Sequence, residues 1–319
     1  MTRFDVTTIG EANLRLSVPK GEKLSLTNNL DLHVAGAEAN VTGALAQLGH
    51  QCGWISALPN SPLGQRGTNA YAFTGLDTSA VNWVDGGRMA TLFVEYAGQP
   101  RPTQVYYDRK NSSFSQITSD DINWDYLLDS RLIHLTGITA ALSESCRSVI
   151  SEVIERAKGA HVPISFDVNY RSKLWSVEEA SATLEKMIRS VDILFCSKRD
   201  AEQVFKINGK VETVLQSLAH RFSTEHVVVS NGAAGVYGWA NDQFYHAPAR
   251  EVDIVDRIGA GDAMAAGVIH GWLNENFAKG IEYGVVAAAC VMSQKGDMLI
   301  IDQAEMDELC RKPITPLSR

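Results

Sequence analysis

Cysteine, proline and long apolar runs are all scarce in this sequence of 319 residues. Its 5 cysteines are widely spaced and include no C-x-x-C pair, so the sequence predicts neither a disulfide framework nor a zinc site. With only 9 prolines and 25 glycines, collagen-like and low-complexity classes are excluded. The longest apolar run, Val285 to Met292, is too short to cross a bilayer. These absences indicate a globular protein with reduced thiols and no membrane partner.

A secretory signal and an excess of positive charge are also missing. The first residues, MTRFDVTTIGEANLRL, lack a basic start followed by a long apolar core, so we expect a cytoplasmic protein. The formal net charge is −8, which disfavours nucleic acids and anionic membranes as partners. A small anionic ligand is compatible with this charge, because it requires only a local positive site.

Strand and helix patterns alternate along most of the chain. The first strand is predicted at Phe4 to Ile9, and a helix at Ala37 to Leu48 ends before Gly49. Later strands, separated by helical patterns, are predicted at residues 132–135, 162–166, 193–196 and 226–229. This alternation indicates a single α/β domain over residues 1–319, in which helices cover both faces of a mostly parallel sheet.

One segment departs from the alternation. From Val81 to Tyr107, short aromatic and β-branched runs alternate with Gly and Pro, as in MATLFVEYAG followed by QPRPTQVYY. The pattern predicts antiparallel strands joined by tight turns. Because the segment is too small to enclose its own core, we expect it to form a lid or an edge sheet.

The sequence D-R-I-G-A-G-D over residues 256–262 precedes an alanine-rich helical pattern. Gly259 and Gly261 flank Ala260, so backbone amides can approach a ligand closely there. A helix N-terminus also favours an anion such as phosphate. Asp262, in the first turn, either complements the helix dipole or takes a proton from a substrate hydroxyl while the amides stabilise a transferring phosphoryl group.

Two common nucleotide-binding motifs are absent. No G-x-x-x-x-G-K-[ST] occurs, and the third position after Gly261 is Met264, which does not fit a dinucleotide fingerprint. A second informative stretch is A-G-A-E-A-N over residues 35–40, where Gly36 begins a helix and Asn40 lies one turn later. Asn40 is either a hydrogen-bonding partner for a polyol or a buried amide satisfied by the protein.

These two stretches resemble the two signatures of the PfkB (ribokinase-like) family of carbohydrate kinases. Residues 35–40 resemble its G-G-x-x-x-N element and residues 256–262 its D-x-x-G-A-G-D element, and the likeness extends over nearly the whole chain. The resemblance implies a ribokinase-like three-layer α/β/α sandwich with a small β-sheet lid. The lid strands would come from about residues 11–35 and 81–115. Ala35 replaces the first glycine of the pair, which would make the lid hinge less permissive.

The resemblance also implies roles for individual residues. Asp262 would be the catalytic base, and the amides of Gly259, Ala260 and Gly261 would hold the γ-phosphate of ATP. Asp256 would belong to the segment beside the nucleotide, which lies near a monovalent-cation site in some members of the family.

Two further stretches resemble the nucleotide side of the family's site. Residues 230–232, with Ser230 and Gly232, resemble together with Gly235 its nucleotide turn. Ser197 and Asp200 take the place of its N-x-x-E element, which organises Mg²⁺ and phosphate through water. Asp200 has a shorter reach than glutamate, so an indirect metal role through water is expected.

Three features resemble, within the family, the 2-keto-3-deoxygluconate kinases. They are V-Y-Y-D-R at 105–109, D-V-N-Y-R at 167–171 followed by Leu-Trp at 174–175, and P-R-P at 100–102. A sugar acid requires a cation for its carboxylate, and arginine binds a carboxylate with two N–H groups. The resemblance places Arg109 with Tyr106 in the lid over the sugar, and Arg171 beside the sugar and the transferred phosphate.

Each of these substrate residues has an alternative interpretation. Arg109 could be a surface charge of the lid, and Arg171 could form a structural ion pair with Asp167 or Glu202. Consecutive residues of a strand point to opposite faces, so only one of Tyr106 and Tyr107 would reach the sugar. Other candidate sugar contacts are Glu11, Asn13, Glu95 and Tyr96.

The reaction predicted from the resemblance is transfer of the γ-phosphate of ATP, with Mg²⁺, to O6 of 2-keto-3-deoxygluconate. A fructokinase or another neutral-sugar kinase, a nucleoside kinase, and a non-catalytic sugar or nucleotide sensor on the same fold are the alternatives. The resemblance further implies a homo-oligomer, dimeric or higher. The gluconate-derived and galactonate-derived epimers are not distinguished by the sequence.

Overall fold

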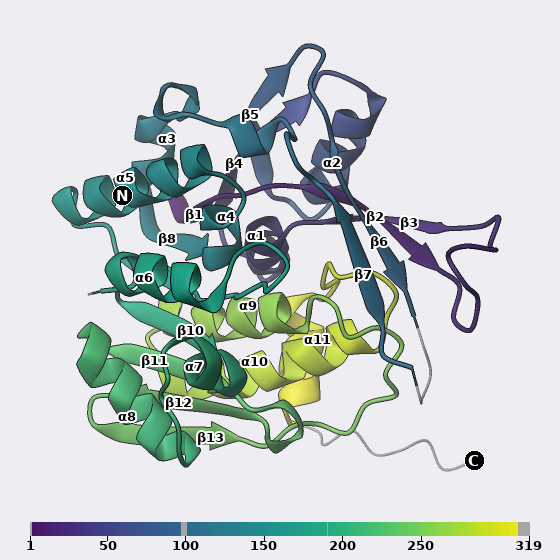
Figure 1. The fold of residues 1–319 in the computed structure, drawn as a ribbon. Helices are drawn as coiled ribbons and strands as arrows, with labels where there is room; N and C mark the ends of the chain where they lie inside the picture. Colours follow the sequence, from purple (N-terminus) through teal and green to yellow (C-terminus); the bar gives the residue numbers. More distant parts are fainter. Residues whose placement is uncertain (1, 97–100, 190, 312–319) are drawn as a thin grey trace.

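A nine-stranded sheet forms the centre of the fold (Figure 1). The computed structural model describes residues 2–96, 101–189 and 191–311. From one edge to the other the strand order is β13-β12-β11-β10-β9-β8-β1-β4-β5. The strands are β1 (Phe4–Ile9), β4 (Cys52–Pro59), β5 (Asp77–Val84), β8 (Ser130–Thr136), β9 (Ile164–Asp167), β10 (Ile193–Ser197), β11 (His226–Ser230), β12 (Val236–Ala240) and β13 (Gln243–Ala247).

The sheet is parallel from β5 to β11, and only the β12–β13 edge runs antiparallel. The hairpin between these two strands turns at Asn241 and Asp242, and both residues have positive φ angles of 51° and 58°. Two central residues with positive φ give a turn whose twist matches that of the paired strands. The parallel remainder follows from the strand–helix alternation, because a parallel connection requires a crossover.

Helices cover both faces of this sheet and enclose two separate apolar cores. One layer comprises α3 (Trp124–Leu128), α4 (Gly137–Ala140), α5 (Glu144–Gly159), α6 (Val177–Met187), α7 (Lys198–Val204) and α8 (Val211–Phe222). The other comprises α1 (Ala37–Gln47), α2 (Pro62–Ala72), α9 (Ala260–Leu273), α10 (Phe277–Met292) and α11 (Gln303–Arg311). The predicted three-layer α/β fold is thereby confirmed. No helix in the described part of the chain is long and apolar enough to cross a membrane.

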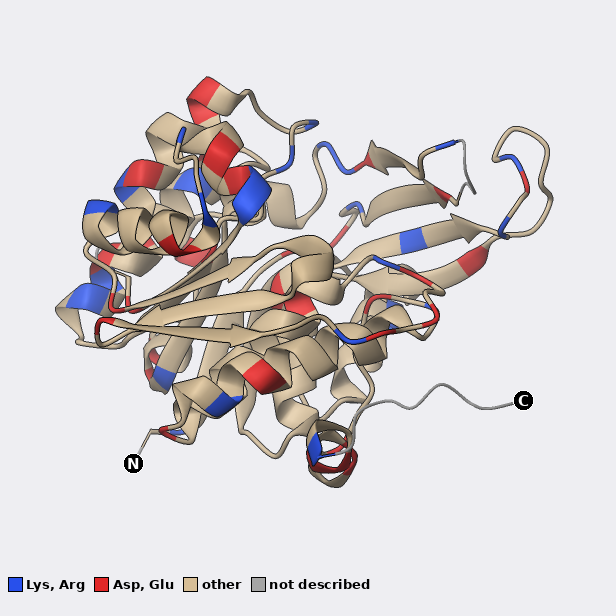
Figure 2. Ribbon diagram, turned by 90° about the horizontal axis from the view of Figure 1, so that it is seen from below, with Lys and Arg blue, Asp and Glu red and all other residues tan. Residues whose placement is uncertain are grey.

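A second, four-stranded sheet extends to one side of the main body (Figures 1 and 2). Its order is β3-β2-β6-β7, and we call it the small sheet. Its strands are β2 (Asn13–Val18), β3 (Asp31–Ala35), β6 (Ala90–Glu95) and β7 (Gln104–Asp108). Pro100 of the P-R-P motif lies outside the described residues.

The small sheet differs in two respects from the sequence-based expectation. Residues 81–84 belong to β5, which pairs in parallel with β4 in the main sheet. The strands β6 and β7 are antiparallel as predicted, but β6 also pairs in parallel with β2, which in turn is antiparallel to β3. Residues 81–107 were expected to form one antiparallel unit because aromatic and β-branched composition signals a strand but not its pairing partner.

The helices α9 and α10 pack backbone against backbone. A Cβ atom added at Gly271 would lie 2.2 Å from the Cα atom of Gly280 on the neighbouring helix. No side chain fits at such a distance, so glycine at this position permits the approach. The packing fixes the axis of α9, whose N-terminus points to the carboxyl ends of the parallel strands, where open α/β sheets bind their ligands.

We predict that Gly271→Ala lowers the free energy of unfolding by about 1–3 kcal/mol, because the two helix backbones must separate. Gly159→Ala is the matched control, since a Cβ atom added at this helical glycine would meet nothing within 4 Å. Urea denaturation of both variants measures the difference. Equal effects on the two variants would contradict the packing argument.

Candidate active site

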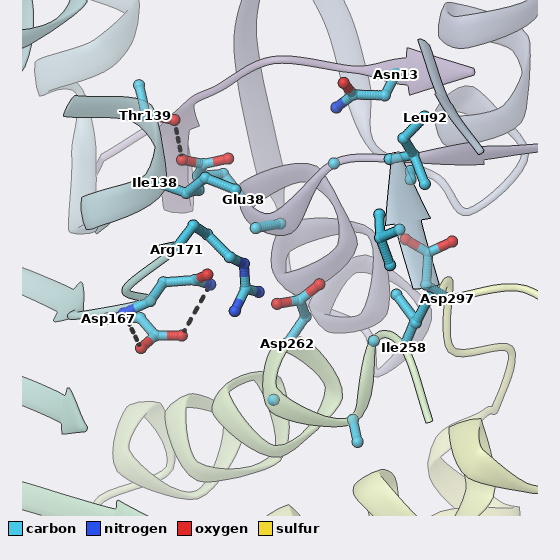
Figure 3. A pocket seen from close by; sticks show the side chains of 18 of the residues that line it. Asn13, Glu38, Leu92, Ile138, Thr139, Asp167, Arg171, Ile258, Asp262 and Asp297 are labelled. Atoms are coloured by element: carbon cyan, nitrogen blue, oxygen red, sulfur yellow. Dashed lines mark hydrogen bonds between the residues drawn. The ribbon is translucent and has the colours of Figure 1, made fainter. Parts of the chain in front are cut away.

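A cavity of about 500 Å³ lies between the main sheet, the first turn of α9 and the small sheet (Figure 3). Its floor is formed by residues at the carboxyl ends of β9 and β10, among them Asp167 and Ser197. The small sheet covers it with Leu92, Val105 and Tyr107. The cavity therefore joins elements from both sheets, which the alternation of strands and helices alone does not reveal.

The N-terminus of α9 carries no side-chain cap. Gly259 is its N-cap residue, with φ of 91°, and the segment Gly259 to Gly261 lines the cavity. A Cβ atom at Gly259 would lie 2.3 Å from the carbonyl oxygen of Asp297, so only glycine fits. Uncapped amides at the positive end of a helix form a binding site for a phosphate-like anion.

Asp262 lies in the first turn of α9 and points into the cavity (Figure 3). Burial raises the pKa of its carboxyl group to about 8, and the neighbouring carboxylates Asp297 and Asp167 act in the same direction. A hydrogen bond from Asn40 Nδ2 to Asp262 Oδ2, at 2.9 Å, and the charge of Arg171 oppose this rise. A carboxylate with a pKa near neutrality is well suited to act as a general base.

The prediction that Asn40 contacts a sugar needs correction. Its Nδ2 donates to Asp262 at 2.9 Å and to Asp297 at 3.2 Å, and its Oδ1 accepts from the hydroxyl of Tyr71 at 3.1 Å. Both N–H groups of the amide are thus used by protein partners. Asn40 does not line the cavity and holds the Asp262 carboxylate from behind, as the alternative interpretation of a satisfied buried amide proposed.

Arg171 is available to a ligand. It lines the cavity with its guanidinium directed toward Asp262 (Figure 3). In the described ranges it forms no ion pair, and Glu202 bonds to Lys198 instead. Burial raises the pKa of Asp167 to about 6 and the charge of Arg171 opposes this rise, so the arginine acts on this carboxylate without pairing to it.

Arg109 also lines the cavity, but its charge is already compensated. Its Nε and Nη2 atoms donate to Glu11 Oε2 at 2.9 Å and 2.6 Å, and Ser112 donates to the other carboxylate oxygen. The side chain is only 8% exposed. Arg109 is therefore neither a surface charge nor a free cation, because Glu11 at the end of β1 neutralises it.

The choice of Tyr106 as the tyrosine over the sugar needs correction. Tyr107 faces the cavity, whereas Tyr106 lies on the opposite face of β7 and is 48% exposed. The ammonium of Lys173 lies 5.6 Å from its ring. The alternation along the strand is as expected, and it is the register of β7 against β6 that decides which tyrosine faces inward.

The predicted nucleotide residues lie at the ends of β10 and β11. Ser197, Asp200 and Ser230 line the cavity, and Ser197 caps α7 by accepting the amide of Asp200 at 2.9 Å. Gly232 and Gly235 follow β11 in a short 3-10 turn but do not reach the cavity wall.

Asp256 is buried and bonds to Arg15 and Tyr96, so its carboxylate faces the small sheet rather than the cavity. The expectation that Asp256 belongs to the segment beside the nucleotide stays a prediction, in which the carboxylate itself is bound by the protein. Arg15, the residue that binds the Asp256 carboxylate on this side, lies on a strand 241 residues earlier in the sequence.

Several cavity residues were not identified from the sequence, namely Glu38, Asp297, Arg15 and Arg257. Burial raises the pKa of Glu38, which accepts hydrogen bonds from Thr136 at 2.6 Å and from Thr139. A charged residue inside the apolar A-G-A-E-A-N stretch is the signal that could have identified Glu38. Nothing comparable distinguishes Asp297 or Arg15, which meet only in the folded chain.

Uncapped amides facing a buried carboxylate at the carboxyl edge of a parallel sheet define the site of a phosphotransferase. A family model described as pfkB family carbohydrate kinase matches residues 3–304. The chain therefore belongs to the pfkB family of carbohydrate kinases.

Individual relatives match over nearly their full lengths. The 2-dehydro-3-deoxygalactonokinase of Haloferax volcanii is 34% identical over 308 residues, which cover 96% of this chain and 96% of the relative. The 2-dehydro-3-deoxygluconokinase of Thermoproteus tenax is 27% identical over 298 residues, covering 92% and 90%. The crystal structure of 2-dehydro-3-deoxygluconokinase from Thermotoga maritima matches with a TM-score of 0.90 at 29% identity, covering 96% of this chain and 99% of that one.

We predict that Asp262→Asn lowers turnover by about 10²- to 10⁴-fold, because the base is lost. The same variant should be more stable than the parent. The folded pKa of about 8 exceeds the reference value of 3.8, so the parent loses stability as the pH rises between these values. The gain in unfolding free energy should grow from pH 4 to pH 8 and then level off. A gain independent of pH, measured by denaturation in a buffer series, would argue against the raised pKa.

We predict that kcat/KM rises with pH along a limb whose midpoint lies near 8, because Asp262 acts only when ionised. Asn40→Ala should shift this limb to higher pH, since it removes the hydrogen bond that favours the charged carboxylate. Initial-rate profiles of both proteins measure the shift. A limb that stays in place, or moves to lower pH, would refute the role assigned to Asn40.

Proposed function

We propose that this chain transfers the γ-phosphoryl group of ATP to a primary hydroxyl of a 2-keto-3-deoxy sugar acid, specifically O6 of 2-keto-3-deoxygluconate. The observation that carries the proposal is the convergence of Asp262, the uncapped N-terminus of α9 and the unpaired Arg171 on one cavity. Asp262 removes the hydroxyl proton, and the amides of Gly259 to Gly261 stabilise the charge on the transferring phosphoryl group.

ATP occupies the side of the cavity formed by Ser197 and Ser230, with Gly232 and Gly235 behind it. Mg²⁺ fits the donor set present. No group of three or more His, Cys, Asp and Glu side chains suited to a metal ion occurs in the described ranges, and Asp200 is the cavity carboxylate beside Ser197. Magnesium commonly binds through one or two carboxylates, phosphate and water, so Asp200 would hold it through water. When bound, the ion neutralises phosphate charge.

A monovalent cation beside Asp256 is the further cofactor that the family resemblance suggests. The Asp256 carboxylate already accepts hydrogen bonds from Arg15 and Tyr96. A protein cation therefore satisfies this carboxylate. Any activating ion would have to bind through other oxygens of the same segment. Activation itself is detected by comparing turnover in potassium, sodium and tetramethylammonium salts.

Arg171 reads the substrate carboxylate in this proposal, because Arg109 is neutralised by Glu11. Arg109 and Tyr107 form the wall over the sugar. Gly36, which has no side chain, lets the sugar come close to the start of α1. The small sheet serves as the lid that excludes water during transfer. The relatives support a keto-deoxy acid as the substrate class, since each of those described above is a kinase of a dehydro-deoxy hexonate by name.

A second candidate substrate is the galactonate-derived epimer. The relative from Haloferax volcanii, at 34% identity, is a 2-dehydro-3-deoxygalactonokinase, whereas the relative from Thermoproteus tenax, at 27%, is a 2-dehydro-3-deoxygluconokinase. The two acids differ at one hydroxyl. Direct comparison of both epimers as substrates therefore decides which hydroxyl the cavity accepts.

We also propose a cytoplasmic homo-oligomer. All 5 cysteines are free, which suits a reducing compartment that supplies ATP. An apolar row crosses the outer face of the small sheet, where Leu16 pairs with Leu32 and Phe93, and Phe93 pairs with Tyr106. Each is partly or largely exposed, so a second copy covering this row would bury it. Light scattering of the parent and of Phe93→Glu measures this association.

We predict that Arg171→Met raises KM for 2-keto-3-deoxygluconate by about 10- to 100-fold, the loss expected when a charged hydrogen bond to a carboxylate is removed. Turnover of fructose, which has no carboxylate, should change little. The exposed Arg189, which does not line the cavity, supplies the control Arg189→Met. A coupled ADP assay with both epimers, fructose, ribose and adenosine measures these values. If only fructose is turned over, and its turnover is unchanged in Arg171→Met, then the substrate is a neutral sugar and the proposed sugar acid is wrong.

A further inference from the structure

Arg15 is a fully buried cation that joins the two sheets. It lies on β2 of the small sheet, and its side chain is 0% exposed. Its Nη1 donates to Asp297 Oδ1 at 3.3 Å, and its Nη2 donates to Asp256 and to the hydroxyl of Tyr96. Two carboxylates of the main body thus meet one guanidinium of the small sheet. Removing one partner from a buried ion pair leaves an uncompensated buried charge, so Asp256 and Asp297 depend on Arg15 in this arrangement of the two sheets.

One branch of this contact leads to the catalytic base. Asp297 accepts from Asn40 Nδ2 at 3.2 Å through its second oxygen, and the same amide nitrogen donates to Asp262 at 2.9 Å. Asn40 therefore lies between the carboxylate held by Arg15 and the carboxylate that removes the proton. A displacement of Asp297 alters the geometry of the Asn40 amide and hence of Asp262.

The other branch leads to the amides that bind the phosphoryl group. Asp256 Oδ1 accepts the backbone amide of Ile258 at 3.0 Å, one residue before Gly259. The side chain of Ile258 packs against Leu92 and Val94 of the small sheet. The carbonyl of Asp297 lies directly beneath Gly259. The segment that presents the amides is therefore held at its N-terminal end by Asp256 and Asp297, the two residues that Arg15 binds.

The small sheet also contacts this region through β3. Lys295 forms an ion pair with Asp31 at 2.8 Å, and a Cβ atom at Gly296 would lie 2.9 Å from Nδ1 of His33. These exposed or half-buried contacts flank the buried Arg15. They show that β2 and β3 sit on the segment 295–297 as a unit, with Arg15 at the centre of the contact.

We propose that Arg15 is a positioning residue for phosphoryl transfer, which places both Asp262 and the amides of Gly259 to Gly261 only when the small sheet is seated on the main body. The inference rests on the proposed function of Asp262 as the base. It adds that the same contact which closes the cavity also completes the catalytic geometry. In this proposal Arg15 does not contact the reacting atoms, and it acts on them through Asn40, Asp256 and Asp297.

The test compares Arg15→Met, Arg15→Lys and Arg88→Met in the full chain. Arg88 is the matched control, because it precedes β6 and bonds to Asp108 within the small sheet while 39% exposed. The kcat of each variant is measured per active site, with the sites titrated by ADP. In Arg15→Met we expect kcat to fall by about 10- to 100-fold, while KM for ATP changes less than about threefold. Arg15→Lys keeps the charge but not the fork, so it should recover part of the loss. Arg88→Met should match the parent.

A double substitution separates positioning from simple stabilisation. If Arg15 acts through Asp297, then Arg15→Met combined with Asp297→Asn should lose no more kcat than the worse single variant. A parental kcat per titrated site in Arg15→Met, with only a lower melting temperature, would overturn the proposal and leave a structural ion pair. Additive losses in the double variant would also overturn it. Retained turnover in Asp262→Asn is a different result, which rejects the base and not the contact made by Arg15.

Discussion

Crowding of carboxylates around one cavity is the constraint on which the rest of the site depends. Each acid removed from water requires compensation, and the kind of partner decides what the acid can do. Glu11 is paired with Arg109, Asp256 and Asp297 share Arg15, and Glu38 is held by hydroxyl groups. Within the described residues the Asp262 side chain has a hydrogen bond only from the amide of Asn40, and burial raises its pKa to about 8. Burial thus raises the pKa values of two cavity acids toward neutrality, to about 8 for Asp262 and about 6 for Asp167.

The buried acids and the arginines that neutralise them come from different parts of the fold. The main sheet and its helices supply most of the acids, whereas Arg15 and Arg109 belong to the small sheet and the segment after it. The small sheet and the segment after it therefore supply the cations that neutralise Glu11, Asp256 and Asp297. Arg171 is different, because it follows β9 on the main body and stays unpaired in the described chain, ready for an anionic ligand.

Features that depend on local pattern could be predicted from the sequence. The alternation of strands and helices specified the parallel sheet, and glycines flanking Ala260 before an apolar helix specified the uncapped amides. Features that depend on distant partners could not. Asn40 looked like a sugar contact because Asp297, 257 residues later, is not adjacent in sequence. Tyr106 was chosen over Tyr107 because strand register is decided by the neighbouring strand. Residues 81–84 were assigned to the small sheet because composition does not identify a strand's partner.

The contact between Gly271 and Gly280 has a consequence for motion. Two helices that touch through their backbones have no side-chain layer to rearrange between them, so α9 and α10 must move as one body. The amides at the start of α9 belong to this same helix, so their position is tied to that of α10. Hydrogen exchange across the α9–α10 contact should accordingly be slow, with the faster opening confined to β2, β3, β6 and β7. The close helix contact thus lies behind the amides that stabilise charge, whereas the small sheet covers the cavity with side chains.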